Sequence, residues 1–186
     1  RYDAAATLLR NSALDQHELL PSVRANVTMT YARHVACMGK TREALDQTER
    51  AFDAAAEFEP DDVPAWSKGF LSNPAHLDSV AARPYLFAGE YDRAIAGFEA
   101  ALSRLGEGRD RGRAYALSLL GLAYLRGGYA DRATATARLL LDAPEGLKSM
   151  RVACHARSLS LELARIGQRD EAASVKAVAE RINPAA

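Results

Sequence analysis

Apolar residues recur along this chain at spacings of three and four, which is the period of one face of an α-helix. After Ala94, for example, the apolar residues Ile95, Phe98 and Leu102 fall on one side of a helix. No window alternates apolar and polar residues for long enough to predict a strand. The pattern therefore predicts an all-α protein.

A short segment that begins with glycine and ends with alanine recurs along the chain. Gly89–Ala94 is followed, at a constant period of 39, by Gly128–Ala133 and Gly167–Ala172. Gly39–Ala44 is an earlier copy, and Ala5 lies one such period before Ala44, whereas the step from Ala44 to Ala94 is longer. A fixed period of this length is typical of stacked helical hairpins.

The positions before the glycines repeat as well. Small residues stand in register, and each is followed three positions later by a bulky one: Ala82 and Tyr85, Gly121 and Tyr124, Ser160 and Leu163. This order predicts a close approach of two helices at the small residue, packing of the large residue against a neighbour, and then a turn at the glycine.

These residues resemble the tetratricopeptide repeat, in which a small residue, an aromatic residue, a glycine and an alanine follow one another at fixed spacing. The matching residues are Ala82, Tyr85, Gly89, Ala94, Phe98 and Ala101, and then Gly121, Tyr124, Gly128 and Ala133. The period is longer than the one usual for this family, which is about 34 residues, and implies a longer loop between hairpins. The resemblance implies a right-handed α–α superhelix of about four hairpins forming one domain over residues 1–186, plus an orphan N-terminal helix near 2–14.

We expect the first helix of each pair over 22–38, 74–88, 110–126 and 146–166, and the second over 41–57, 91–105, 130–142 and 169–182. The hairpins then span 22–57, 74–105, 110–142 and 146–182, with an insertion at 58–73. Ser22 and Asn73-Pro74 are expected to start helices, and Pro144 and Asn183-Pro184 to follow helix ends.

Residue 1 falls between the two helices of a predicted hairpin, and no initiator methionine is present. We therefore expect a fragment of a longer protein. Tyr2, Leu8 and Leu9 would then form an uncovered apolar face, which invites fraying of the helix or pairing with a second copy as a homodimer.

Composition narrows the range of partners and the compartment. Twenty-four basic residues balance twenty-four acidic ones, so the chain lacks the positive field that direct nucleic-acid binding requires. It has no apolar run long enough to span a membrane and no signal-peptide pattern. With only two cysteines, Cys37 and Cys154, it does not read as a disulfide-stapled secreted protein. We expect a cytoplasmic protein that binds neither nucleic acid nor membrane.

The insertion at 58–73 adds a resemblance to a narrower group of repeat proteins. Trp66 follows Pro64, Phe70 comes four residues later on the same helical face, and a hairpin of the Ala82–Ala101 type comes next. This order is similar to the C-terminal repeat region of actinobacterial transcriptional regulators that carry an N-terminal helix-turn-helix. That similarity implies a ligand-sensing or peptide-sensing and oligomerisation domain of a cytoplasmic regulator. The alternative is a generic adaptor scaffold that joins two proteins.

A tetratricopeptide array binds its partners along the concave face that the first helices line. Registering on the small residue places twelve first-helix residues in this groove: Asn26, Met29, Arg33, His76, Ser79, Arg83, Tyr115, Ser118, Leu122, Cys154, Arg157 and Leu161. Arg33, Arg83 and Arg157 suit a carboxylate or a phosphate, so the predicted ligand is an acidic peptide or a small anion. The alternative is that these arginines only solvate their helices or pair with local Asp and Glu residues. Trp66 and Phe70 could form an aromatic wall of the pocket or simply fill the core.

No group of residues predicts catalysis or a cofactor. His34 and Cys37 lie one helical turn apart, but Cys154 and His155 are three hairpins away, so neither a shared metal ion nor a disulfide is expected. The glycine-rich stretch Gly106–Gly112 follows a predicted helix, unlike a phosphate-binding loop, which follows a strand. The sequence contains no nucleotide-binding, zinc-protease or nucleophile-elbow motif. We therefore expect a binding module and not an enzyme.

Overall fold

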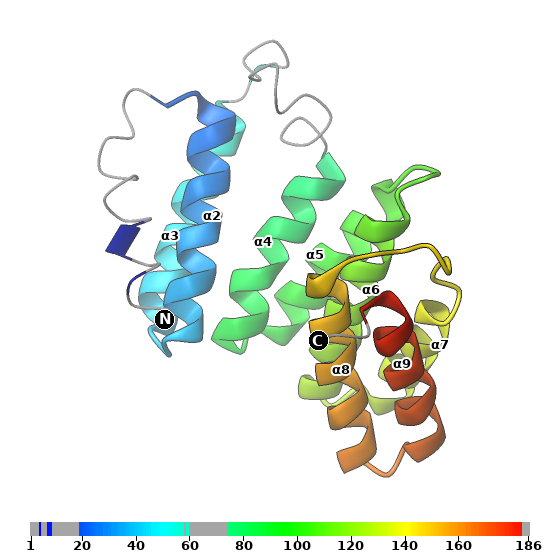
Figure 1. The fold of residues 1–186 in the computed structure, drawn as a ribbon. Coiled ribbons are helices and arrows are strands. Elements are labelled where there is room, and N and C mark those ends of the chain that lie inside the picture. The colour runs from blue at the N-terminus through cyan, green and yellow to red at the C-terminus, as the bar shows by residue number, and fades with distance from the viewer. Residues whose placement is uncertain (1–3, 5–6, 9–18, 58, 60–73, 184–186) are drawn as a thin grey trace. The chain divides into compact units, whose positions relative to one another are not determined.

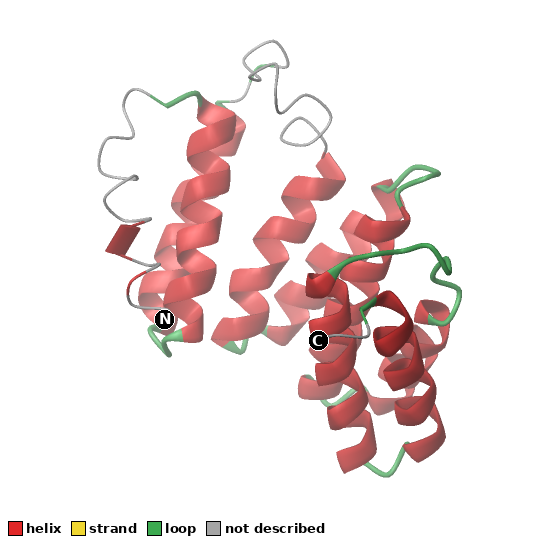
Figure 2. Cartoon of the chain, in the orientation of Figure 1, coloured by secondary structure: helices red, strands yellow, loops and turns green. Residues whose placement is uncertain are grey.

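The structure, a computed structural model, describes residues 4, 7–8, 19–57, 59 and 74–183. Within these residues the chain forms eight α-helices and no strand (Figure 2). The helices are α2 (Pro21–Cys37), α3 (Thr41–Ala56), α4 (Pro74–Ala88), α5 (Tyr91–Arg104), α6 (Asp110–Arg126), α7 (Ala130–Leu140), α8 (Met150–Arg165) and α9 (Arg169–Ile182). The prediction of an all-α protein built from paired helices is confirmed.

The chain divides into two compact units, Arg1–Gly97 and Phe98–Ala186, with the boundary inside α5. In the first unit α2 packs against α3 and α4, which lie beside it in Figure 1, and α3 also contacts α4. In the second unit α6 packs against α7, and α8 against α9. Contacts of α6 with α8 and of α7 with α9 join these two pairs. Whether both units belong to one domain stays a prediction.

The turn between paired helices has the same geometry in all four hairpins. Its glycine has a positive φ of 77° at Gly39, 89° at Gly89, 85° at Gly128 and 86° at Gly167. The residue after the glycine donates its backbone N–H to the carbonyl five positions earlier, as Tyr129 does to Tyr124 at 2.8 Å and Gln168 to Leu163 at 3.0 Å. This bond satisfies a carbonyl that the helix end leaves unpaired. The recurring glycines therefore occupy equivalent turns, as predicted.

The small residues lie where helices approach closely. A Cβ atom on Gly97 of α5 would lie 2.9 Å from the Cβ of Ala82 in α4. One on Gly121 of α6 would lie 2.8 Å from the Cδ2 of Leu159 in α8. The Ser160 hydroxyl donates to the carbonyl of Ala172 across the α8–α9 hairpin, at 2.7 Å. Carbon atoms pack best at about 3.5–4.0 Å, so only small side chains fit at these positions.

Several boundaries differ from the prediction. The first helix of the last pair begins at Met150 and not at 146, because Ser149 caps it by accepting a hydrogen bond from the Val152 N–H at 3.4 Å. The helix expected over 130–142 ends at Leu140. Ser22 does not begin its helix, since Pro21 is the first helical residue and Leu20 holds the cap position.

Two predicted segments lie almost entirely outside the described residues: the orphan helix near 2–14 and the insertion at 58–73. Asn73 and Pro184 lie outside them as well. No helix in the described part of the chain is both long and apolar enough to cross a membrane.

Candidate functional site

The first helices of the first unit, α2 and α4, lie side by side and point the same way. Met29 of α2 packs in a buried cluster with Val80 and Ala81 of α4. Further along, Phe87 of α4 packs against the cluster that holds Val35 of α2. The earlier residue of α2 thus contacts earlier residues of α4, and the later residue contacts a later one, so the two helices are parallel. This packing places the predicted groove residues of α2 and α4 on neighbouring helices.

Five of these six groove residues are half-buried: Asn26, Arg33, His76, Ser79 and Arg83. The sixth, Met29, has 3% of its surface exposed and belongs to the core. The Nε2 atom of His76 and the Nε atom of Arg83 are shielded from solvent, as is the Nε atom of Arg33. Polar groups therefore line this pair of helices at the edge of the core.

Arg33 is the most informative of these residues. Its Nη2 lies 3.2 Å from the Nε2 of His34, and the Nδ1 of His34 lies 2.8 Å from the carbonyl of Thr30. In the neutral ring Nδ1–H therefore donates to Thr30, which leaves Nε2 to accept from Arg33. The shielded Nε of Arg33 makes no hydrogen bond, and within the described residues no carboxylate pairs with this guanidinium.

Other arginines of the chain do have carboxylate partners. The pairs are Arg24 with Glu57, Arg126 with Glu162, Arg132 with Glu99, and Arg138 with Glu171. A half-buried cation is costly unless an anion or several hydrogen-bond acceptors stabilise it. An external anion bound at Arg33 would therefore stabilise a half-buried cation that has no carboxylate partner among the described residues.

The groove residues of the second unit are engaged in packing. The Tyr115 ring meets the His155 ring edge-on at 5.4 Å, and Arg151 lies 5.6 Å from the centre of the Tyr115 ring. Ser118 is fully buried and donates its hydroxyl to the Tyr115 carbonyl at 2.8 Å. Leu122 has 3% of its surface exposed.

Three further groove positions lie on α8. Cys154 is exposed. Arg157 donates from Nη2 to the carbonyl of Asn183, the cap residue that follows α9, at 2.9 Å. Leu161 has 63% of its surface exposed. The assignment of groove residues as ligand contacts stays a prediction in both units. Trp66 and Phe70, the proposed aromatic wall, lie outside the described residues.

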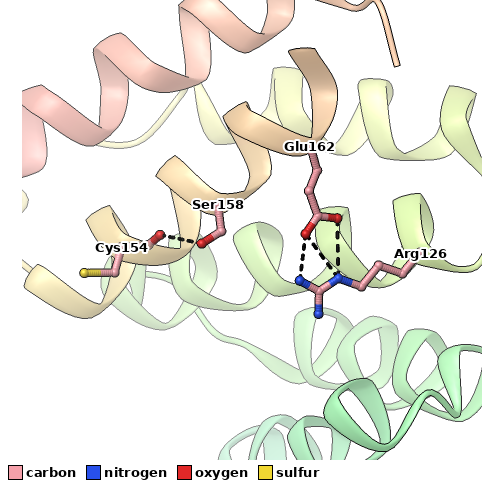
Figure 3. Close-up of polar contacts among 4 residues, drawn as sticks. All are labelled: Arg126, Cys154, Ser158 and Glu162. Carbon is pink, nitrogen blue, oxygen red and sulfur yellow. Dashed lines mark hydrogen bonds and ion pairs between the residues drawn. The ribbon is translucent and has the colours of Figure 1, made fainter. Parts of the chain in front are cut away.

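An ion pair that the sequence analysis missed joins α6 to α8. The Arg126 guanidinium faces the Glu162 carboxylate with Nη2 at 2.7 Å and Nε at 3.2 Å from Oε1 (Figure 3). In the same view the Ser158 hydroxyl donates to the Cys154 carbonyl at 3.1 Å, and the thiol points away from that bond. The separation of the two partners along the chain is close to the repeat period, and this is the signal that could have predicted the pair.

A second polar cluster lies where α5, α6 and α7 meet in the second unit. The Tyr124 hydroxyl donates to Glu99, Arg132 donates to the same carboxylate at 2.8 Å, and the Arg132 guanidinium lies 4.5 Å from the centre of the Tyr124 ring. The pKa of Tyr124 is raised to about 12, first because the phenol is buried and then because of the hydrogen bond and the negative charge of Glu99.

Part of this cluster recurs one repeat period earlier. Arg93 donates to the Tyr85 hydroxyl at 2.8 Å and lies 4.1 Å from the centre of its ring. Burial raises the pKa of Tyr85; the charge of Arg93 lowers it in part, and the charge of Glu49 raises it. The tyrosines at this repeat position thus share one role, which is to bind an arginine of the following helix.

One repeat period after Glu99 and Arg132, an ion pair forms at the equivalent two positions, but the acidic and basic residues are exchanged. Glu171 stands one period after Arg132, and Arg138 stands one period after Glu99. Arg138 donates to Glu171 at 2.6 Å, and this hydrogen bond is the main cause of the lowered pKa of Glu171. The second helices are therefore joined by ion pairs at equivalent positions, with opposite polarity.

The described residues offer little for a cofactor. They contain no group of three histidine, cysteine or acidic side chains that could bind a metal ion. Cys37 is half-buried and Cys154 is exposed. A cavity of about 120 Å³ lies between α7 and α9, with Ala137 and Val175 among its lining residues. Pockets for drug-sized ligands and cofactors measure about 300–1,000 Å³, so this cavity suits at most a side chain.

Comparison with known proteins does not assign the chain to a family. No protein-family model matches the sequence, and no curated protein is significantly similar to it.

Proposed function

We propose that this chain is a non-catalytic binding module that holds an acidic peptide or a small anionic ligand along its first helices. The scaffold in this proposal is a right-handed superhelix of the tetratricopeptide type. The repeated glycine turns and the small residues at close helix contacts support that scaffold. As the sensor and oligomerisation part of a cytoplasmic transcriptional regulator, the module would couple ligand binding to a change between two states of the protein.

The observation that carries the proposal is the half-buried guanidinium of Arg33. Its Nε is shielded without an acceptor, and within the described residues its side chain has a hydrogen bond only to the His34 ring. A carboxylate that reached this group would restore the charge compensation that other arginines obtain within the chain.

The distribution of charge over the helices also supports an anionic ligand. The first helices carry nine arginines and only three acidic residues: Arg24, Arg33, Arg83, Arg111, Arg113, Arg126, Arg151, Arg157 and Arg165 against Asp78, Asp110 and Glu162. The second helices carry nine basic and ten acidic residues. The neutral chain therefore has a positive excess on the helices that are proposed to line the groove, which favours an anionic partner.

Calorimetric titration of the whole chain with acidic peptides tests this proposal. We expect saturable binding that Arg33→Ala weakens at least tenfold, because a charge-assisted hydrogen bond contributes about 1.5–3 kcal/mol. Arg83→Ala, on the neighbouring helix, should weaken binding as well. Arg42→Ala is the matched control, since Arg42 is exposed on α3, outside the first helices. A peptide with glutamine in place of glutamate should bind poorly. Equal binding of both peptides, or equal loss in all three variants, would refute the anionic site.

A further inference from the structure

A polar stripe on α2 extends the site beyond Arg33. Ser22, Asn26, Met29 and Arg33 are spaced by four, three and four residues, so they fall within an arc of about 60° on the helix. Met29, which is buried as Ser22 is, contacts α4 through Val80 and Ala81. The other three present a hydroxyl, an amide and a guanidinium along the same side of α2.

Ser22, at the far end of this stripe, is a buried polar group without a partner. It has 2% of its surface exposed, and its Oγ makes no hydrogen bond. An unsatisfied buried hydroxyl costs about 1–3 kcal/mol, so a structural role alone does not explain why a serine stands here. Alanine would fill nearly the same space without that cost.

The N-terminus of α2 adds donors at the same place. Leu20 at the cap position offers no side-chain acceptor, Pro21 follows it, and the first turn contains no acidic residue. The free N–H groups and the helix dipole at such an end favour an anion. Arg24 does not interfere, because it lies about 160° around the helix from Ser22, where it pairs with Glu57.

We infer that the ligand is an extended acidic segment with two carboxylates about four or six residues apart, because an even spacing turns both side chains to the same face. One carboxylate would bind Ser22 and the N-terminus of α2, and the other would bind Arg33, with Asn26 contacting the backbone between them. The helical rise from Ser22 to Arg33 is about 16 Å at about 1.5 Å per residue. An extended peptide covers this distance in about five residues at about 3.2–3.4 Å each, and the nearest spacings that keep both carboxylates on one face are about four and six. The inference rests on the proposed function and specifies its ligand.

A peptide series tests the spacing. Otherwise identical glycine- and serine-rich peptides with blocked termini carry two glutamates separated by two, four, five, six or eleven positions, and one peptide carries a single glutamate. Calorimetry with the whole chain should give the highest affinity at a spacing of four or six, about tenfold above the single-glutamate peptide, and weaker binding at five, where the two side chains point to opposite faces. Tightest binding at eleven would indicate a helical ligand and would overturn the extended geometry.

Ser22→Ala provides the second arm of the test. We expect it to reduce the affinity of the tightest-binding two-glutamate peptide about tenfold, to the level of the single-glutamate peptide, while the melting temperature of the free protein stays equal or rises. Ser103→Ala is the control, because Ser103 is exposed on α5 and its hydroxyl bonds to the carbonyl of Ala100. If Ser22→Ala lowered stability and left affinity unchanged, Ser22 would be a structural residue only.

The two proposals fail in different ways. If acidic peptides bind through Arg33 but their affinity does not depend on spacing, the two-point arrangement is wrong and the anionic site stands. If no acidic peptide binds, the proposed function itself is refuted.

Discussion

The contact between Gly97 and Ala82 allows a stability prediction with a built-in control. Gly97→Ala places a methyl group 2.9 Å from the Cβ of Ala82, and both atoms are fixed to helix backbones. Neither methyl can rotate away, so α4 and α5 must separate. Overpacking of this kind costs about 1–3 kcal/mol, while replacing glycine inside a helix gains about 1 kcal/mol. We expect a net loss of about 0–2 kcal/mol, with a central value of about 1 kcal/mol.

The reverse substitution, Ala82→Gly, removes the methyl from the other helix. It should cost about 2 kcal/mol, because helix propensity and the burial of one methyl are both lost. In the double variant Gly97→Ala with Ala82→Gly, the methyl moves from α4 to α5 and the clash disappears. Its stability should lie within about 1 kcal/mol of the parent protein, which implies a coupling energy of about 2–3 kcal/mol.

Urea unfolding followed by circular dichroism of the helical signal measures all four members of this cycle. The double variant should unfold near the parent midpoint, and each single variant should unfold at lower urea. Additive losses, with coupling below about 0.5 kcal/mol, would show that Gly97 and Ala82 do not share one space, and the close approach of α4 and α5 would be refuted.

Three further predictions concern individual side chains. Because the pKa of Tyr124 is raised from 10.0 to about 12, the folded protein holds this proton more tightly than the unfolded chain. Its contribution to the free energy of unfolding should be complete below pH 10 and lost as the pH rises through about 12. The urea midpoint of Tyr124→Phe should therefore fall less steeply over that pH range than the midpoint of the parent protein. Glu162→Gln should lower stability by about 0.5–1 kcal/mol. This difference from the parent protein should shrink in about 1 M salt, because the ion pair with Arg126 is partly exposed. A difference that salt does not change would exclude an electrostatic origin. Ser149→Ala should cost about 1 kcal/mol in urea unfolding by removing the cap of α8, whereas Ser149→Asp should retain most of the stability.

The sequence predicted the hairpins well because their signals are local. A glycine with positive φ, a small residue seven positions before it and an alanine five positions after it all lie within one turn and its flanks. These signals placed every helix start except that of α8 to within one residue. The expected start of α8 at 146 places its cap, Ser149, inside the predicted helix, so the sequence pattern did not predict Ser149 as a cap.

The site was harder to predict because its features depend on contacts between distant residues. The face of a helix that a residue occupies can be read from spacing, so Arg33 was placed in the groove. The sequence does not show whether a carboxylate reaches that guanidinium, or that Ser22 lies buried without a partner. Likewise, Arg157 was assigned to the ligand, but the position of its guanidinium depends on where α9 ends.

The reversed polarity of the ion pairs between second helices has a consequence for how this array can change in evolution. Loss of one repeat unit, the one that holds Arg132 and Arg138, would bring Glu99 against Glu171. Tandem duplication of the same unit would bring Arg138 of one copy against Arg132 of the next. Either recombination event would set like charges side by side, so these modules cannot be shuffled freely despite their common architecture.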